Sequence, residues 1–185
     1  MPLSARLSPD RTALVVVDFQ EKLVPAVVDH ARVVRNALLL LQVARTLNLP
    51  VVLTTQYAKG LGPTIPEVQE AAGVAAMDKL TFGCFGDAAF TERLRALGDR
   101  RQLVVTGIET HICVAQTVFG ALDSGYEVQV ASDAVSSRTA GNRDVGLARM
   151  ERAGAVLSSA EMVVYELLGR SDSAAFKAML PFLKA

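Results

Sequence analysis

The sequence contains few of the residues on which metal centres and disulfide frameworks are built. Its 185 residues include two histidines, two cysteines and no tryptophan. Two cysteines in a chain without a signal peptide are more typical of free thiols than of a disulfide framework. Residues 1–6 lack the apolar stretch of a signal peptide, and no apolar run is long enough to cross a bilayer. We therefore expect a cytoplasmic protein that is not embedded in a membrane.

The sequence also lacks an excess of either charge, because 19 basic residues balance 19 acidic ones. No basic cluster occurs, so nucleic acids and anionic membranes are disfavoured as partners. Apolar residues, in contrast, make up 51% of the chain, which is slightly more than usual. A chain of this length can bury a substantial core, and we expect a single domain over residues 1–185.

Apolar strands alternate with helical segments along the whole chain. Strands are expected at residues 14–17, 51–54, 75–80, 102–106, 127–131 and 155–157. Helices are expected at residues 25–48, 87–97, 110–124, 142–153, 159–168 and 173–180. The Gly/Pro-rich residues 59–66 indicate a loop. The pattern predicts an α/β fold with three layers, α/β/α, built on a doubly wound, six-stranded parallel sheet with strand order 3-2-1-4-5-6.

Three residues that can carry chemistry stand at or near strand ends. Asp18 closes the first strand, Lys79 lies near the end of the third, and Cys113 opens the helix after the fourth. Ligands bind such sheets beyond the carboxyl ends of the strands, where strand order reverses, so Asp18 and Cys113 are expected to meet. Lys79 lies two strand spacings away, roughly 9–10 Å. Either its connection curls inward or its side chain leans over the second strand.

Taken singly, each of these three residues has a more ordinary interpretation. An aspartate after a strand is often a turn former, a lone lysine is usually a solvated charge, and a lone cysteine is usually packed in the core. Their convergence at one rim of the sheet indicates a reactive site, because a base, a cation and a thiol form a set that chemistry can use.

The segments that carry these residues together resemble the isochorismatase-like hydrolases, a superfamily of cysteine hydrolases that includes nicotinamidases and carbamoylsarcosine amidohydrolases. The resemblance covers nearly the whole chain and rests on residues 15–20, 56–64, 78–82, 107–114 and 133–138. Residues 56–64, Gln-Tyr-Ala-Lys-Gly-Leu-Gly-Pro-Thr, are similar to those of uncharacterised isochorismatase-domain proteins. The combination is specific, whereas any one segment alone is a weak signal.

The resemblance implies a cysteine-dependent hydrolase. Cys113 would be the nucleophile that forms a thioester, Asp18 the general base, and Lys79 the cation that keeps Asp18 ionised. The helix N-terminus and Lys79 are expected to lower the pKa of the Cys113 thiol below about 8.5. The family's cis peptide falls at Ile108–Glu109, and the backbone N–H groups of Glu109 and Cys113 would form an oxyanion hole.

The small number of histidines limits the range of substrates that the resemblance implies. Metal-dependent nicotinamidases carry an Asp-x-His element after the second strand and a further histidine beyond it, whereas this chain has only His30 and His111. No zinc site and no other cofactor are therefore expected, and nicotinamide is disfavoured. Retention of Cys113 favours hydrolysis of an amide, carbamoyl or related C–N bond in a small molecule. Two alternatives stay open, a non-catalytic or thiol-sensing scaffold and, less favoured, a vinyl-ether hydrolase acting on isochorismate.

Side chains on the segments around the three residues are candidates for the substrate pocket. They are Phe19, Gln20, Gln56, Tyr57, Phe82 and His111. For each of them, packing or solvent exposure is an equally good interpretation on sequence alone. A structural role is favoured for Cys84, which follows Lys79 in the next loop. Asp133 and Arg138 are expected to stabilise the loop after the fifth strand.

Assembly is implied only by the resemblance, since members of the family are commonly homo-oligomers. The tail of the chain carries apolar residues at helical spacing, among them Phe176, Leu180 and Phe182. This pattern is compatible with an interface between subunits and equally with a helix packed on its own sheet.

Overall fold

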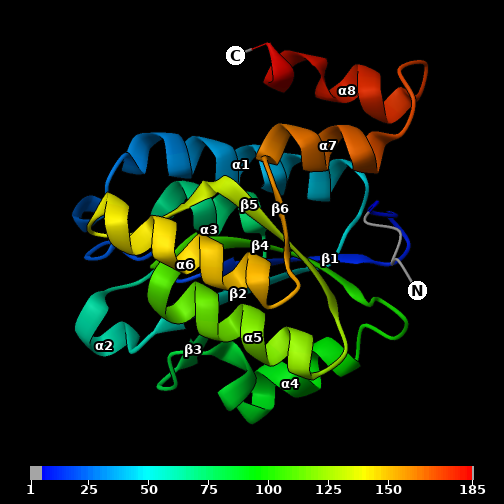
Figure 1. Ribbon diagram of the computed structural model, residues 1–185. Helices are drawn as coiled ribbons and strands as arrows, with labels where there is room; N and C mark the ends of the chain where they lie inside the picture. The colour runs from blue at the N-terminus through cyan, green and yellow to red at the C-terminus, as the bar shows by residue number, and fades with distance from the viewer. Residues whose placement is uncertain (1–5, 185) are drawn as a thin grey trace.

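A computed structural model describes residues 6–184, and its centre is a six-stranded sheet (Figure 1). All strand pairs are parallel, and the strand order is β3-β2-β1-β4-β5-β6. The strands are β1 (Thr12–Val17), β2 (Val51–Gln56), β3 (Met77–Lys79), β4 (Gln102–Ile108), β5 (Glu127–Ser136) and β6 (Val156–Ser158). The predicted sheet and strand order are therefore confirmed. Residues 1–5, which belong to the segment considered for a signal peptide, lie outside the described part.

Helices cover both faces of the sheet, as the alternating pattern predicted. One face carries α1 (His30–Thr46), α3 (Pro66–Ala72) and α7 (Ala160–Leu168), with α8 (Ala174–Leu183) outside them. The other face carries α4 (Ala88–Arg95), α5 (Ala115–Asp123) and α6 (Ala140–Arg152). Within residues 6–184, no helix is both long and apolar enough to cross a membrane.

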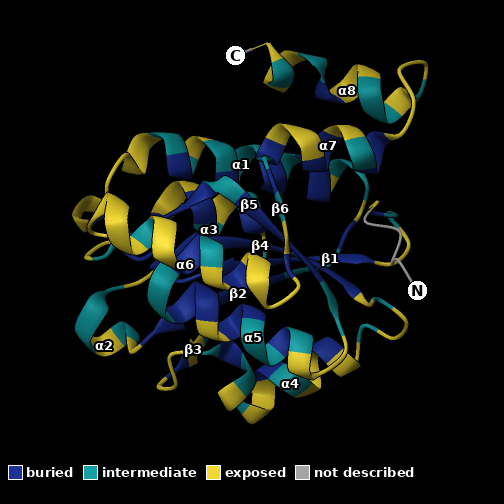
Figure 2. Cartoon of the chain, viewed as in Figure 1, coloured by how far each residue is buried: buried dark blue, intermediate teal, exposed yellow. Residues whose placement is uncertain are grey.

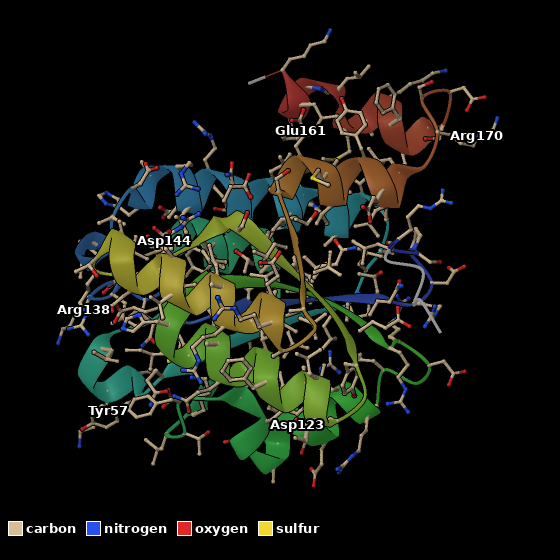
Figure 3. The ribbon with its side chains drawn as sticks, in the orientation of Figure 1. Tyr57, Asp123, Arg138, Asp144, Glu161 and Arg170 are labelled. Atoms are coloured by element: carbon tan, nitrogen blue, oxygen red, sulfur yellow. The ribbon has the colours of Figure 1, made fainter. Side chains whose placement is uncertain are left out.

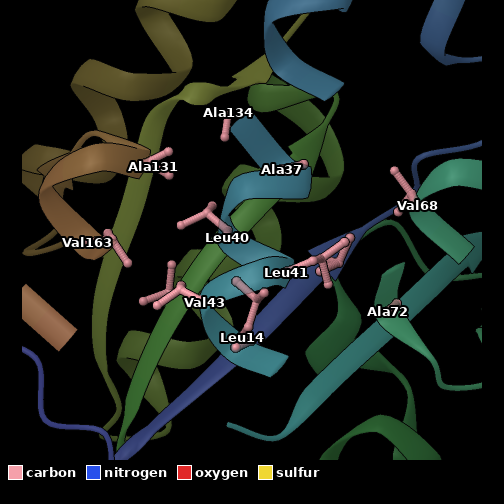
Figure 4. Close-up of a cluster of buried hydrophobic side chains, with 14 of the residues drawn as sticks. Leu14, Ala37, Leu40, Leu41, Val43, Val68, Ala72, Ala131, Ala134 and Val163 are labelled. Carbon is pink, nitrogen blue, oxygen red and sulfur yellow. The ribbon is translucent and has the colours of Figure 1, made fainter. Parts of the chain in front are cut away.

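The central strand β1 explains why the sheet needs cover on both sides. Leu14 and Val16 point into the core under α1, whereas Val15 and Val17 point into the core under α4, α5 and α6. Figure 2 shows the strands as a buried layer between helices whose outer faces are exposed. Figure 4 shows the first core, in which Leu40 and Leu41 of α1 lie over β1. Each fully buried side chain of this size contributes roughly 1.5–3 kcal/mol, so the two-sided burial fixes β1 firmly.

Several segments differ from the sequence-based expectation because local backbone geometry overrides the pattern. The helix expected over 25–48 is divided into a short 3₁₀ turn (Val24–Ala26) and α1, since Asp29 has a left-handed φ of 54°. The expected loop 59–66 begins inside a single helical turn, α2 (Ala58–Leu61). Helix α3 was not predicted, although Pro66 at its first position and Gly73 after its end are typical helix signals.

Strand β5 is longer than expected and contains Asp133. The pairing of β4 with β5 is irregular between Val105 and Gly107, so that β5 continues beyond the irregularity and pairs again through Val135 and Ser136. The placement of Asp133 after this strand was therefore wrong. Its carboxylate accepts a hydrogen bond of 2.8 Å from the backbone N–H of Ala160 and thereby anchors the start of α7.

The tail forms α8, which packs on other helices rather than on the sheet. It contacts α1 and α7, and Met179 is its fully buried residue (Figure 1). Phe176 packs partly against the core under α1, whereas Phe182 stays about half exposed.

Candidate active site

The carboxylate of Asp18 lies at the carboxyl end of the central strand. Asp18 follows β1 directly, has a left-handed φ of 56° and is fully buried. Aspartate tolerates this backbone conformation better than most residues. The hydroxyl of Thr54, at the end of neighbouring strand β2, donates a hydrogen bond of 2.8 Å to Asp18 Oδ1. The chain thus turns sharply here and leaves a charged group inside the protein.

Lys79 supplies the opposite charge from β3. Its Nζ lies 2.7 Å from Asp18 Oδ2 and 2.9 Å from Gln56 Oε1. Because Gln56 pairs with Lys79 across β2 and β3, the lysine side chain leans over the end of β2 to reach Asp18. Both charged side chains are almost completely buried. A buried ion pair is tolerated only when close geometry and further hydrogen bonds offset the loss of solvation, and both are present here.

Cys113 lies in a wide helical turn, Thr110–Val114, that has π geometry and continues into α5. The turn follows β4, whose last peptide bond, between Ile108 and Glu109, is cis. Gly107 allows β4 to approach β1 closely, because a Cβ at this position would lie 2.3 Å from the carbonyl oxygen of Val17. Cys113 is 6% exposed, and its thiol lies close enough to Asp18 and Lys79 for their charges to act on its pKa. The structure thereby brings Asp18, Lys79 and Cys113 together.

The electrostatics of the Cys113 thiol correct the expectation drawn from the helix terminus. Burial raises its pKa to about 12, and the negative charge of Asp18 acts in the same direction. Lys79 lowers the pKa, but its effect is smaller. The expected lowering was wrong because Lys79 is already paired with Asp18 and the thiol has little contact with water. In the resting protein the thiol is therefore protonated.

The second thiol, Cys84, lies behind this group and is fully buried. Its backbone N–H donates 3.1 Å to the hydroxyl of Thr117, which itself donates 2.7 Å to the carbonyl oxygen of Cys113. The Cys84 Sγ lies 3.9 Å from the hydroxyl of Thr54. Burial raises the pKa of Cys84 to about 11. The loop after Lys79 is thus tied to the turn that carries Cys113.

The loop after β5 holds the start of the turn that carries Cys113. Glu109 Oε2 accepts hydrogen bonds from both the backbone N–H of Arg138, at 2.9 Å, and its Nε, at 3.1 Å. Glu109 is nearly buried, whereas the Arg138 side chain is mostly exposed. Arg138 lies in the loop after β5, as expected, and joins this loop to the end of β4. His111 Nδ1 lies 2.9 Å from the buried Ser137 Oγ and adds a second link.

Two of the six side chains considered for the substrate pocket are buried and make contacts within the protein instead. Phe19 is fully buried in the core under α1. Gln20 is also fully buried. Its amide nitrogen donates to the carbonyl oxygens of Gln56 and Gly62, and its amide oxygen accepts from the N–H of Gln56. Gln20 therefore fixes the connection after β2 and offers no free polar group to a ligand.

The other four side chains lie nearer the surface at the same end of the sheet. Gln56 is largely buried and engaged with Lys79 and with the carbonyl oxygen of Leu80. Tyr57 is 47% and Phe82 56% exposed, and His111 is partly buried. In Figure 3, Tyr57 and Arg138 lie toward the same end of the molecule, where the connections beyond the strands gather. The assignment of these four side chains to a substrate pocket stays a prediction.

Sequence reasoning did not identify Thr54 and Thr117, which hold the reactive groups in place. The available signal was in β2, where Thr54-Thr55-Gln56 ends an otherwise apolar strand with polar residues. In a strand, residues 54 and 56 point to one side and residue 55 to the other. Thr54 and Gln56 accordingly contact Asp18 and Lys79, whereas Thr55 donates 2.9 Å to Asp78 Oδ1.

Comparison with known proteins shows the family of the chain. Residues 12–162 match the isochorismatase domain, which is most of the chain and includes Asp18, Lys79 and Cys113. The chain belongs to the isochorismatase family. The family assignment made from the sequence motifs is thus confirmed.

Relatives in the isochorismatase family span nearly the same length. The chain is 38% identical to isochorismatase domain-containing protein 2 of Danio rerio over 93% of this chain and 86% of that protein. It resembles YcaC from Pseudomonas aeruginosa, a structure with hexane-2,5-diol and covalent acrylamide, with a TM-score of 0.91, 32% identity and coverage of 98% and 93%. It also resembles YcaC of Escherichia coli, an octameric hydrolase of unknown specificity, with a TM-score of 0.90, 28% identity and coverage of 98% and 92%.

The side chains of the protein indicate whether it has a place that could hold a metal ion. Among residues 6–184, the structure has no group of three or more histidine, cysteine, aspartate or glutamate side chains arranged to hold a metal ion. His111 is engaged with Ser137 instead.

Proposed function

We propose that this isochorismatase-family protein is a cysteine-dependent hydrolase of a small-molecule amide, carbamoyl or related C–N bond. The observation that carries the proposal is that a buried carboxylate, Asp18, paired with Lys79 at 2.7 Å, acts electrostatically on the buried, protonated thiol of Cys113. A nucleophile with an adjacent base and a group that orients this base is the recurrent arrangement of covalent catalysis.

In the proposed reaction, Asp18 removes the proton from Cys113 while Sγ attacks the carbonyl carbon of the substrate. The tetrahedral intermediate then collapses, the C–N bond breaks, and Asp18 delivers the proton to the leaving nitrogen. A thioester remains on Cys113. Water attacks the thioester carbonyl with Asp18 as the base, the C–S bond breaks, and the proton returns to Sγ. Each step transfers one proton through Asp18, and the enzyme is regenerated.

The raised thiol pKa makes this use of Asp18 necessary. A thiol with a pKa of about 12 contains almost no thiolate at neutral pH, so proton removal has to be coupled to attack. Lys79 balances the charge of Asp18 and holds one of its oxygens in place. The backbone N–H groups of Glu109 and Cys113 are proposed to stabilise the developing oxyanion, an interaction whose loss costs roughly 10²–10³ in rate.

The relatives support the proposal in two respects. The P. aeruginosa YcaC structure contains covalent acrylamide, so a protein of this fold forms a covalent bond with a small molecule. E. coli YcaC is an octameric hydrolase, and we propose that the present chain also forms a homo-oligomer.

The test is a hydrolysis screen over small amides, ureas and carbamoyl compounds with three proteins. Wild type should turn over at least one compound, Cys113→Ala should abolish turnover, and Asp18→Asn should reduce it by about 10²–10⁴-fold. Asp123→Asn is the matched control, because it removes one carboxylate at the exposed end of α5 (Figure 3). Turnover that persists in Cys113→Ala would contradict the covalent mechanism. No turnover of any compound would favour the scaffold alternative.

A further inference from the structure

Thr54 occupies the position between the candidate base and the second buried thiol. Its hydroxyl lies 2.8 Å from Asp18 Oδ1 and 3.9 Å from Cys84 Sγ, and Thr54 is 1% exposed. The reaction proposed above uses neither Thr54 nor Cys84. A buried hydroxyl and a buried thiol placed in series behind a catalytic carboxylate call for an explanation.

The direction of these hydrogen bonds follows from the chemistry of each group. An ionised carboxylate only accepts, so the single proton of the Thr54 hydroxyl points to Asp18. The hydroxyl oxygen can then accept a hydrogen bond from the S–H group of Cys84. Cys84 is available as a donor at neutral pH because burial raises its pKa to about 11. The chain of donors therefore runs from Cys84 through Thr54 to Asp18.

We propose that Thr54 is a positioning residue that holds the Asp18 carboxylate turned toward Cys113, and that Cys84 orients the Thr54 hydroxyl for this task. The inference deepens the proposed function and rests on Asp18 acting there as the base. It assigns to Cys84 a role as a hydrogen-bond donor and not as a second nucleophile.

The two carboxylate oxygens show why one partner is not sufficient. Thr54 holds Oδ1 and Lys79 holds Oδ2, so that rotation of the carboxylate about its bond to Cβ breaks both hydrogen bonds. With Lys79 alone, the carboxylate can swing around the ammonium group, and its second oxygen is left without a donor in a buried site. A buried acceptor without a donor is costly, so the charged carboxylate loses stabilisation when the Thr54 hydroxyl is absent.

The test uses the pH dependence of alkylation at Cys113, which requires no knowledge of the substrate. Iodoacetamide is applied to the intact protein between about pH 4.5 and 9, and modification of Cys113 and Cys84 is quantified separately by peptide mass spectrometry. Thr54→Val removes the donor at nearly constant volume. We expect the acidic limb of the Cys113 rate profile to move to higher pH by about one unit, and the neutral rate to fall roughly tenfold. Thr54→Ser keeps the hydroxyl and should restore both.

Thr55→Val is the matched control, because it makes the same chemical change one residue away on the other side of β2, where the hydroxyl contacts Asp78. Its Cys113 profile should coincide with that of wild type. Circular dichroism at each pH confirms that the variants remain folded over the range used. Identical profiles for Thr54→Val and Thr55→Val would overturn the inference.

Variants of Cys84 test the part of the proposal that concerns the hydrogen bond from Cys84 to Thr54. Cys84→Ala should shift the acidic limb in the same direction as Thr54→Val but by less, whereas Cys84→Ser, which keeps a donor, should lie closer to wild type. A Cys84→Ala profile equal to that of wild type would remove Cys84 from the inference. Failure of the proposed function has a different signature, namely persistence of substrate turnover in Cys113→Ala or alkylation of Cys113 no faster than that of Cys84 in wild type.

Discussion

At the scale of single residues, the two buried thiols control how this protein responds to alkaline conditions. The pKa of Cys84 is raised to about 11 and that of Cys113 to about 12, against about 8.5 for an exposed cysteine. Above about pH 8.5 the unfolded chain therefore releases protons that the folded protein retains. Stability that is fully present below this pH is consequently lost as the pH rises toward 11.

The resulting prediction concerns the slope of stability against pH. The urea midpoint of wild type should fall between about pH 8.5 and 10.5, and each thiol contributes up to about 1.4 kcal/mol per pH unit. Cys84→Ser removes one of the two groups, because a serine hydroxyl does not titrate in this range. The midpoint of this variant should therefore decline less steeply than that of wild type, while both remain level between pH 6 and 8. Parallel declines in the two proteins would show that Cys84 does not retain its proton.

At the scale of helices and strands, the sequence was most informative where the hydrophobic pattern alone decides the structure. The apolar run 14–17 predicted a strand buried on both faces, and β1 is such a strand. The pattern could not show that Asp29 adopts a left-handed backbone and separates α1 from the preceding turn. It also did not indicate the renewed pairing that extends β5, since this depends on an irregularity in the contact with β4.

For the candidate site, too, the sequence predicted some features and not others. Asp18, Lys79 and Cys113 were identified because strand ends of a doubly wound sheet converge. The thiol pKa was not predicted correctly, because it depends on burial and on the pairing of Lys79 with Asp18, which are properties of the folded state. Thr54 was missed for a related reason, since its role depends on a contact of 2.8 Å between neighbouring strands.

Helix α6 offers a test of how tightly one element supports the turn that carries Cys113. A Cβ added at Gly146 would lie 3.0 Å from the Cα of His111 and 3.2 Å from the backbone of Thr110, whereas at Gly141 it would meet nothing within 4 Å. Alanine is favoured over glycine in a helix by up to about 1 kcal/mol. Gly141→Ala should therefore raise the free energy of unfolding by roughly 0.4–1 kcal/mol. Gly146→Ala should not show this gain, because backbone atoms of the turn have to move.

The same pair of variants separates stability from reactivity. Gly146→Ala should also lower the rate of Cys113 alkylation at neutral pH, since displacement of the turn moves the thiol relative to Asp18. Gly141→Ala should leave this rate unchanged. Equal stability gains and equal alkylation rates in the two variants would show that α6 does not constrain the turn.

At the scale of the whole molecule, the candidate catalytic groups all come from one chain, whereas the proposed assembly involves several. Asp18, Lys79 and Cys113 meet within a single sheet, and no second subunit is needed to bring them together. Tyr57 and Phe82, in the connections after β2 and β3, are exposed and take no part in holding these three groups. Assembly and the intrinsic reactivity of Cys113 can therefore be measured independently.

The mass of the protein in solution tests the proposed assembly directly. One chain has a mass of 19.7 kDa. Light scattering coupled to size exclusion should give twice this value or a higher integral multiple at micromolar concentration, in line with the octameric E. coli relative. A mass of one chain at all concentrations would contradict the proposal. If dilution dissociates the assembly, the preference of iodoacetamide for Cys113 over Cys84 should persist in the single chain, because the carboxylate, the ammonium group and the thiol remain together within it.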